Sequence, residues 1–508
     1  MSLPSAQRVT VIGAALLALF LGALDALVMS AAMPTIVSDL GGLQLYSWVY
    51  SAYFLARAVS LPIFGKLADL YKNRNLFIGA IILFSLSSAA AGCAVNMVTL
   101  IMARVIQGIG AGGIFALVYI VLADVAPPEK RGRTLSLASS IWGIASVLGP
   151  TLGGFIVTYF SWRWIFFINL PLGIFSIWGI GTYLVELREK KSKVTLDLLG
   201  VATLSTAILA FLFAFLLGGR TYPWVSPRIL GLLAMFVIGT AVFIVVERRA
   251  KDPILPMQMF RKRGFSAGNM AVFLSSFAIF SMFAYAPLFI QGVQGKSPME
   301  VGVAMLSLSL GWSIGSLALG QVVDRMGRRY AAGTGALCLV LGSSMTLAFS
   351  AQTTTYYSFA SFFVIGLGMG FVALATLLVV QSAVPPQDLG VATSSNQFAR
   401  TLGGTVGVGI GGGFIATRFS ALSEAFQERG LLDQLPSSLG DAGLSRIEGL
   451  LRPDVMAALP EDIRLWVQES VRQGVQAVFW TVLAAAALCF LVCCLIPGDT
   501  AVRGEQDV

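Results

Sequence analysis

The chain has 508 residues, of which 56% are hydrophobic and 12% are charged, and it carries a formal net charge of +9. Soluble domains carry about 25% charged residues, so a water-soluble core cannot hold this much apolar surface. The composition therefore excludes an ordinary soluble enzyme and predicts an all-α protein that crosses a membrane many times.

Three further features narrow the chemistry. The basic residues lie in loops between apolar runs, so we expect no nucleic-acid partner. The five cysteines all lie within apolar runs, which argues against disulfides, and their spacing predicts no metal site. The chain has no histidine, so any proton relay must use carboxylates. It also lacks the glycine-rich phosphate loop of ATP-driven pumps, which disfavours a primary pump, and we expect no cofactor.

The apolar runs predict fourteen membrane-spanning helices. In chain order they span residues 9–32, 47–67, 76–94, 98–122, 134–158, 164–185, 197–217, 228–247, 266–290, 300–322, 331–350, 355–380, 391–417 and 475–496. The predicted organisation is an N-terminal six-helix bundle (1–190), two inserted helices with their linkers (191–262), and a C-terminal six-helix bundle (263–508) that includes an external loop at 419–474.

The orientation follows from lysine and arginine in the short loops. The N-terminus and every second loop are rich in these residues, whereas the opposite short loops hold only Arg163, Arg220, Arg228 and Lys296. The positive-inside rule therefore places both termini in the cytoplasm, and we expect a bacterial inner-membrane protein.

The first predicted helix carries Asp25, the only carboxylate deep within a predicted span. This run lacks a clear cleavage site, so we expect a helix rather than a cleavable signal peptide. Asp25 and Arg104 each lie about seven residues, or roughly 10 Å, from the external ends of their helices, so they can meet at one depth. A proton that binds when the pair separates would couple charge to conformation. The alternative is a structural partner for a buried arginine.

A repeat follows the second and tenth predicted helices, which read GKLADLYKNRN and GQVVDRMGRRY. Each copy has a glycine, an aspartate four residues later and then basic residues; the candidate residues are Gly65, Asp69 and Arg74 in the first copy and Gly320, Asp324 and Arg328 in the second. Parallel six-helix repeats are a transporter plan with the substrate site between the halves. Each aspartate can cap a helix N-terminus at the inner boundary, or it can be ordinary loop charge.

The stretch GIASVLGPTLGG, from Gly143 to Gly154, bares one face of the fifth helix. Ala145, Gly149 and Gly153 recur every four residues, so a neighbouring helix can approach closely. Pro150 favours a kink there. We expect a moving contact between the two bundles, with ordinary tight packing as the alternative.

Two more arginines, Arg57 and Arg400, lie near the middle of the second and thirteenth helices. With Trp142 and Gln107, they are the candidate substrate-cavity residues. The alternatives are a pairing or snorkelling role for Arg57 and a packing role for Trp142. On the fourth helix, Arg104, Gly108 and Gly112 share one face, which leaves room beside the arginine.

Together these motifs resemble the major facilitator superfamily, and within it the fourteen-helix drug:proton antiporters of the EmrB/QacA type. GKLADLYKNRN resembles the signature between helices 2 and 3, LIMARVIQGIGAGG the helix 4 signature, and GIASVLGPTLGG the helix 5 motif of exporters. LDALVMSAAMP resembles the helix 1 motif but carries Leu27 where threonine is usual and Ser30 where asparagine is usual. The resemblance implies that Asp69 belongs to a latch that holds the inner side closed.

The resemblance implies a proton-coupled exporter of amphiphilic compounds that works by alternating access, with multidrug efflux as the leading function. A lipid or fatty-acid exporter and a non-transporting receptor or scaffold are the alternatives. One deep acid stands against three deep arginines, so we expect neutral or anionic amphiphiles to be preferred over dications. An accessory protein on the periplasmic side or the cell surface is left open.

Overall fold

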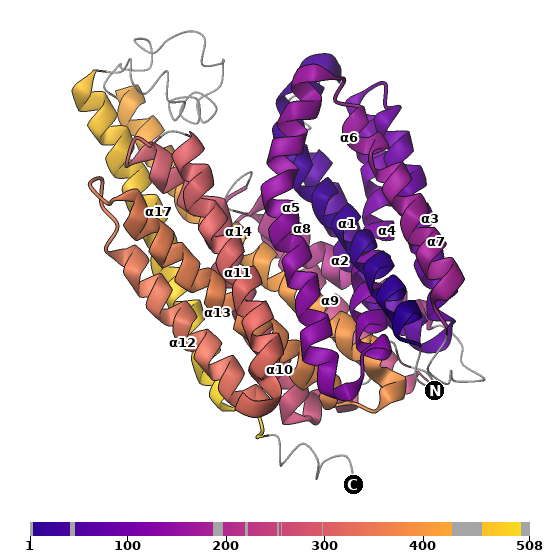
Figure 1. Ribbon diagram of the computed structural model, residues 1–508. Coiled ribbons are helices and arrows are strands. Elements are labelled where there is room, and N and C mark those ends of the chain that lie inside the picture. The colour runs from indigo at the N-terminus through magenta and orange to yellow at the C-terminus, as the bar shows by residue number, and fades with distance from the viewer. Residues whose placement is uncertain are drawn as a thin grey trace.

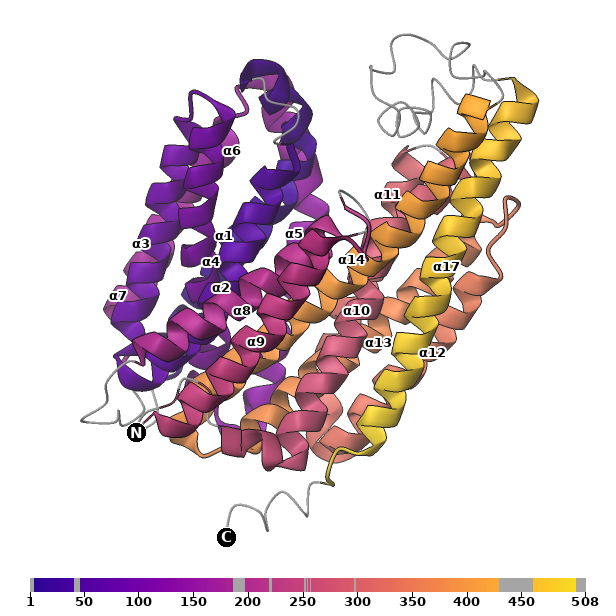
Figure 2. The same cartoon turned by 180° about the vertical axis from the view of Figure 1, so that it is seen from behind.

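The computed structural model describes residues 4–40, 46–185, 197–218, 222–250, 257–296, 298–428 and 460–498, together with Pro253 and Leu255. Within these ranges nearly every ordered element is a helix, which confirms the all-α prediction. Figures 1 and 2 show two helix bundles, with a helical hairpin lying across one side of the space between them.

The first bundle holds the helices of the N-terminal half. They are α1 (Ser5–Leu40), α2 (Tyr46–Leu70), α3 (Asn73–Gly92), α4 (Met97–Val125), α5 (Arg131–Tyr159), the short α6 (Trp164–Phe167) and α7 (Asn169–Tyr183). Each of the first five predicted spans falls on one of these helices, and the sixth is divided between α6 and α7.

The hairpin and the second bundle follow. The hairpin is α8 (Leu198–Leu217) and α9 (Pro227–Arg249). The second bundle is α10 (Arg263–Gly292), α11 (Pro298–Met326), α12 (Arg328–Leu347), α13 (Thr355–Ser382), α14 (Leu389–Glu428) and α17 (Glu461–Cys494). Among the described residues, 11 helices are long and apolar enough to cross a membrane, and α2, α5 and α8 are outside that set. The count of fourteen spans therefore stays a prediction.

Helices occupy both ends of the segment 419–474, because α14 continues to Glu428 and α17 begins at Glu461. Phe419, Leu422 and Phe426 are buried along one face of α14, and the Phe426 ring stacks on Trp466 of α17 with centroids 6.2 Å apart. The polar residues between them form the other face of an amphipathic helix, and the external position of the whole segment stays a prediction. Residues 429–459 lie outside the described part of the chain.

The two bundles meet at the end of the molecule where α1 begins and α17 ends, called here the terminal end, and they diverge toward the far end (Figure 1). The repeated glycines make this contact. A Cβ on Gly65 of α2 would collide with the Ser394 hydroxyl of α14, and one on Gly320 of α11 would lie 2.6 Å from the Ser136 Oγ of α5. Both copies of the repeat therefore bring a helix of one bundle against the backbone of a helix in the other.

The glycines on α5 meet different neighbours from those that the sequence predicts. A Cβ on Gly143 would overlap the Ser313 hydroxyl of α11, in the other bundle. A Cβ on Gly149, in contrast, would lie 2.7 Å from the Cβ of Leu27 on α1, inside the first bundle. Six helical residues turn the chain by about 240°, so these two glycines point to different neighbours. The assignment of Gly149 to the moving contact is therefore wrong.

The rest of this stretch fits the same arrangement. Gly153 is buried, and a Cβ on Gly154 would meet no atom within 4 Å. α5 continues as a helix through Pro150, and a kink there stays a prediction.

Asp69 at the end of α2 joins the two bundles at the place where the resemblance predicts a latch. Its carboxylate accepts hydrogen bonds from the backbone N–H of Gly390 at 2.8 Å and of Val391 at 2.9 Å, in the first turn of α14. A buried carboxylate at a helix N-terminus is stabilised by both the N–H groups and the helix dipole. The predicted helix-capping geometry is present at Asp69.

The second copy of the repeat does not form this latch. Asp324 is exposed at the end of α11, and no hydrogen bond or ion pair joins it to another described residue. Arg74 is exposed and Arg328 is half-buried, each in the first turn of the helix that follows its aspartate. The terminal end is therefore latched through one half of the repeat.

Asp69→Ala should weaken the closure of the terminal end. It removes two hydrogen bonds to a charged acceptor, each worth about 1.5–3 kcal/mol, which corresponds to a shift of about tenfold or more in the closed–open equilibrium. The measurement is the distance between spin labels on the terminal ends of α2 and α14, which should lengthen. Asp324→Ala is the matched control and should keep the wild-type distance. Equal distances in wild type and Asp69→Ala would rule out the latch.

Candidate functional site

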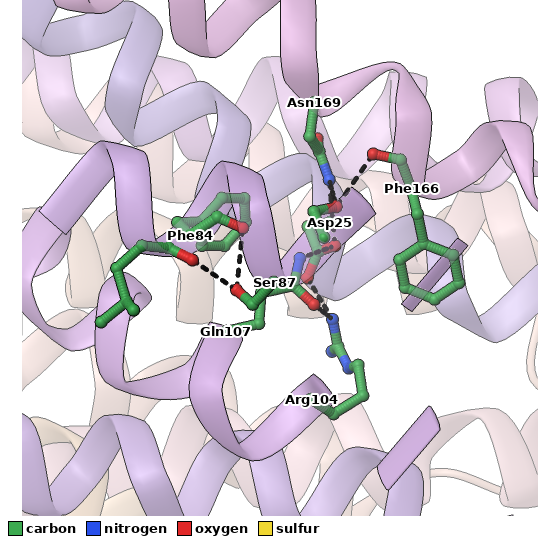
Figure 3. Close-up of polar contacts among 9 residues, drawn as sticks. Asp25, Phe84, Ser87, Arg104, Gln107, Phe166 and Asn169 are labelled. Atoms are coloured by element: carbon green, nitrogen blue, oxygen red, sulfur yellow. Dashed lines mark hydrogen bonds and ion pairs between the residues drawn. The ribbon is translucent and has the colours of Figure 1, made fainter. Parts of the chain in front are cut away.

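The side chain of Asp25 is enclosed by polar groups from two other helices. Arg104 Nη1 donates to Asp25 Oδ2 at 2.6 Å, and Gln107 Nε2 donates to Oδ1 at 2.9 Å, both from α4. Asn169 Nδ2, at the start of α7, donates to Oδ1 at 3.2 Å. Figure 3 shows these three side chains converging on the carboxylate. Asp25 and Arg104 are each 1% exposed, and they meet as their matched depths in the sequence predict.

The geometry of α4 explains why two of these groups converge. Arg104 and Gln107 are three residues apart and lie on one helix face. Arg104 Nη1 also donates to Gln107 Oε1 at 2.8 Å, which turns the amide nitrogen toward Asp25. Gln107 is thus a partner of the buried carboxylate, and its assignment to the substrate cavity is wrong. Helical spacing places Gln107 beside Arg104 but does not reveal which of them faces the cavity.

Asn169 is a member of this network that sequence reasoning missed. Its amide also donates to Ser88 Oγ of α3 at 3.0 Å, and that hydroxyl donates to the carbonyl of Phe166 at 2.9 Å. A single asparagine in an apolar run was the available signal, because a buried amide needs partners. Three helices besides α1 therefore hold the Asp25 carboxylate in place.

The glycines of α4 do not leave room beside Arg104, because α2 fills it. A Cβ on Gly108 would lie 2.9 Å from the Ala56 Cβ, and one on Gly112 would lie 2.8 Å from the Arg57 carbonyl oxygen. This close approach places the Tyr53 ring of α2 against Arg104, with 4.1 Å from the guanidinium carbon to the ring centroid. The bare face thus serves to bring α2 onto the buried ion pair.

A cavity of about 520 Å³ lies between the bundles, within the size range of drug-binding pockets. Arg57, Arg400 and Trp142 line it, as the sequence predicts for the substrate site. α1 contributes Ala26 and Leu27, so the chain faces the cavity immediately after Asp25, while the Asp25 carboxylate points away into the bundle.

The inserted hairpin also forms part of this cavity, which sequence reasoning did not anticipate. Leu212, Phe215 and Gly218 of α8 belong to the lining. A Cβ on Gly409 of α14 would lie 2.7 Å from the Phe215 carbonyl oxygen, so α8 packs directly on the α14 backbone. Toward the first bundle, α8 contacts α2 through the apolar cluster that contains Leu55 and Ala58. The hairpin therefore closes one side of the cavity.

Comparison with known proteins identifies the family. Residues 15–408 match the Major Facilitator Superfamily. The chain is 34% identical over 503 residues to the multidrug transporter protein MdtP of Bacillus subtilis (strain 168), covering 95% of this chain and 92% of that protein. It is 31% identical over 486 residues to multidrug resistance protein 3 of the same organism, covering 94% and 93%.

Solved structures of low sequence identity share the fold. The human organic anion transporter MFSD10 aligns with a TM-score of 0.63 at 14% identity, covering 96% of this chain and 100% of that one. The proton:xylose symporter XylE aligns with a TM-score of 0.61 at 15% identity, covering 97% of each chain. The finer assignment to the fourteen-helix drug:proton antiporters stays a prediction. The chain, with two helix bundles around a central cavity, belongs to the major facilitator superfamily and is a transporter, not an enzyme.

Proposed function

We propose that this transporter exports amphiphilic compounds in exchange for protons, by alternating access of the central cavity to the two sides of the membrane. The observation that carries the proposal is the cavity between two bundles that Asp69 joins at the terminal end. The multidrug relatives favour efflux over uptake. Following the lysine and arginine pattern, we place the terminal end in the cytoplasm of the bacterial inner membrane, so the latched arrangement is closed to the inside.

Asp25 is the proposed proton-binding group. It is an acid deep within a span, and its carboxylate is balanced by Arg104. Protonation would remove the negative charge that holds the arginine, and Arg104 also lies against Tyr53 of α2. A change at the ion pair therefore reaches α2, which carries Arg57 in the cavity and Asp69 in the latch. This arrangement supports coupling of proton binding to the closure of the inner side.

The cavity favours neutral or anionic amphiphiles as substrates. No aspartate or glutamate is found among its described lining residues, which include two arginines and many aromatic and aliphatic side chains. A buried cation without a counter-charge is costly, so dications should be poor substrates. An exporter of lipids or fatty acids fits the same cavity and is the second candidate. A receptor or scaffold role has no support from the transporter relatives.

Asp25→Asn should abolish uphill efflux but retain downhill exchange of substrate. Asparagine keeps the size and one acceptor oxygen but cannot be protonated and deprotonated. The measurement is substrate movement in proteoliposomes with and without an imposed pH gradient. If the variant still accumulates substrate against a gradient with the wild-type pH dependence, Asp25 is not the coupling group.

A double variant separates stability from coupling. Removing one partner of a buried ion pair costs about 3–5 kcal/mol, because the other charge is left uncompensated. Arg104→Gln should therefore lower the melting temperature of the purified protein, and Asp25→Asn/Arg104→Gln should recover most of that loss. Uphill efflux should stay absent in the double variant. Recovery of uphill efflux together with stability would show that the pair has only a structural role.

A further inference from the structure

The central cavity contains two positive side chains that lack acidic partners. Arg57 lies on α2 in the first bundle and Arg400 on α14 in the second, and both line the cavity. Arg104 is already paired with Asp25. No ion pair joins Arg57 or Arg400 to an aspartate or glutamate in the part of the chain that the structure describes. The cavity therefore carries two unneutralised charges within the membrane.

Arg57 is surrounded by aromatic rings. Its guanidinium carbon lies 4.8 Å from the ring centroids of both Phe54 and Phe115. Cation–π contacts compensate part of the charge but satisfy no N–H group. Arg57 Nη1 is buried and has no hydrogen-bond partner among the described residues. This nitrogen therefore keeps an unused donor at the cavity.

Arg400 also has a guanidinium nitrogen without a hydrogen-bond partner among the described residues. Its Nη1 donates to Gln397 Oε1 at 3.1 Å, and its guanidinium carbon lies 5.3 Å from the Trp312 ring centroid. Its Nε is buried and finds no hydrogen-bond partner among the described residues. A guanidinium presents its donors in a planar fork that matches an oxyanion. Each bundle thus offers one such fork with an open donor.

Both guanidinium groups line one cavity, and two like charges in a shared apolar cavity repel each other. An oxyanion between them would remove this repulsion and accept the open N–H groups. The Ser309 hydroxyl adds a further polar group to the lining. The rest of the wall is apolar, with Phe280, Phe283 and Phe215 among its members. The cavity therefore combines a polar anion-binding part with an apolar part.

We propose that Arg57 and Arg400 form one anion subsite that binds the oxyanion headgroup of an amphiphile (a carboxylate, sulfate or phosphate), while the apolar part of the cavity holds its tail. This inference rests on the proposed function and names the substrate class for the same cavity. Because the two arginines belong to different bundles, a bound anion bridges the bundles, whereas a neutral amphiphile does not.

The test is competition binding to the full-length protein in nanodiscs with ligands of matched tail length. Decanoate, decanol and decyltrimethylammonium differ in charge and share a ten-carbon chain. The variants are Arg57→Gln, Arg400→Gln and the double variant. Arg163→Gln is the control, because it removes a half-buried arginine that pairs with Asp39 outside the cavity lining.

The expected readout is the ratio of decanoate to decanol affinity within each protein. Wild type and Arg163→Gln should prefer decanoate, and each cavity variant should lower the ratio about tenfold, as expected for loss of a charge-assisted pair. The double variant should lose little beyond the single ones, because the two arginines hold one headgroup. Tighter binding of decyltrimethylammonium than of decanoate to wild type, or an unchanged ratio in both single variants, would overturn the subsite.

Two further arms separate the explanations. Naphthalenesulfonate has an oxyanion but no alkyl chain. If its affinity depends on the arginines and equals that of decanoate, the natural substrates include xenobiotic anions; if its affinity is much weaker, the natural substrates are lipid-like anions. Either result supports the subsite. Gradient-driven export of decyl sulfate, a permanently charged ten-carbon anion, by wild type in proteoliposomes tests the proposed function independently. If that export is absent while the affinity ratio still depends on the arginines, the proton-driven exporter is wrong and the anion subsite stands.

Discussion

The enclosure of the Asp25 carboxylate is the constraint on which the first bundle depends. A charge inside an apolar bundle is tolerated only with a counter-charge and satisfied hydrogen bonds. Arg104 and Gln107 of α4 and Asn169 of α7 provide them, so α1, α4 and α7 must meet at one depth. The bare glycine face of α4 then admits α2, whose Tyr53 ring covers the arginine.

α2 connects this buried pair with the rest of the transport machinery. Tyr53 touches Arg104, Arg57 lies one turn further in the cavity, and Asp69 caps α14 at the terminal end. Tyr53 and Asp69 are sixteen residues apart, which spans about 24 Å along a helix. Pro62 lies between them inside α2 and removes one backbone hydrogen bond of this helix. The contact with the ion pair, a cavity side chain and the Asp69 carboxylate therefore lie along one continuous helix that contains a proline, and a change at the ion pair can reach the other two through α2.

The hairpin of α8 and α9 forms one wall of the cavity between the two bundles. α8 packs on the α14 backbone at Gly409, while it meets α2 through apolar side chains such as Leu55. Contacts between apolar side chains have little directional preference, whereas a backbone contact at a glycine fixes the separation of two helices. We infer that α8 moves with the second bundle and that its contact with α2 is the one that changes.

The sequence by itself determined the membrane class, the position of nearly every helix, and the depth at which Asp25 and Arg104 meet, because composition and apolar run length act locally along the chain. It also placed Arg57 and Arg400 at the cavity and Asp69 at a helix N-terminus. Only the tertiary structure decided which neighbour each helix face meets. Gln107 binds Asp25, and Gly149 packs on α1. Periodicity relates residues within one helix, but the rotation of that helix against its partners depends on contacts between residues far apart in the chain.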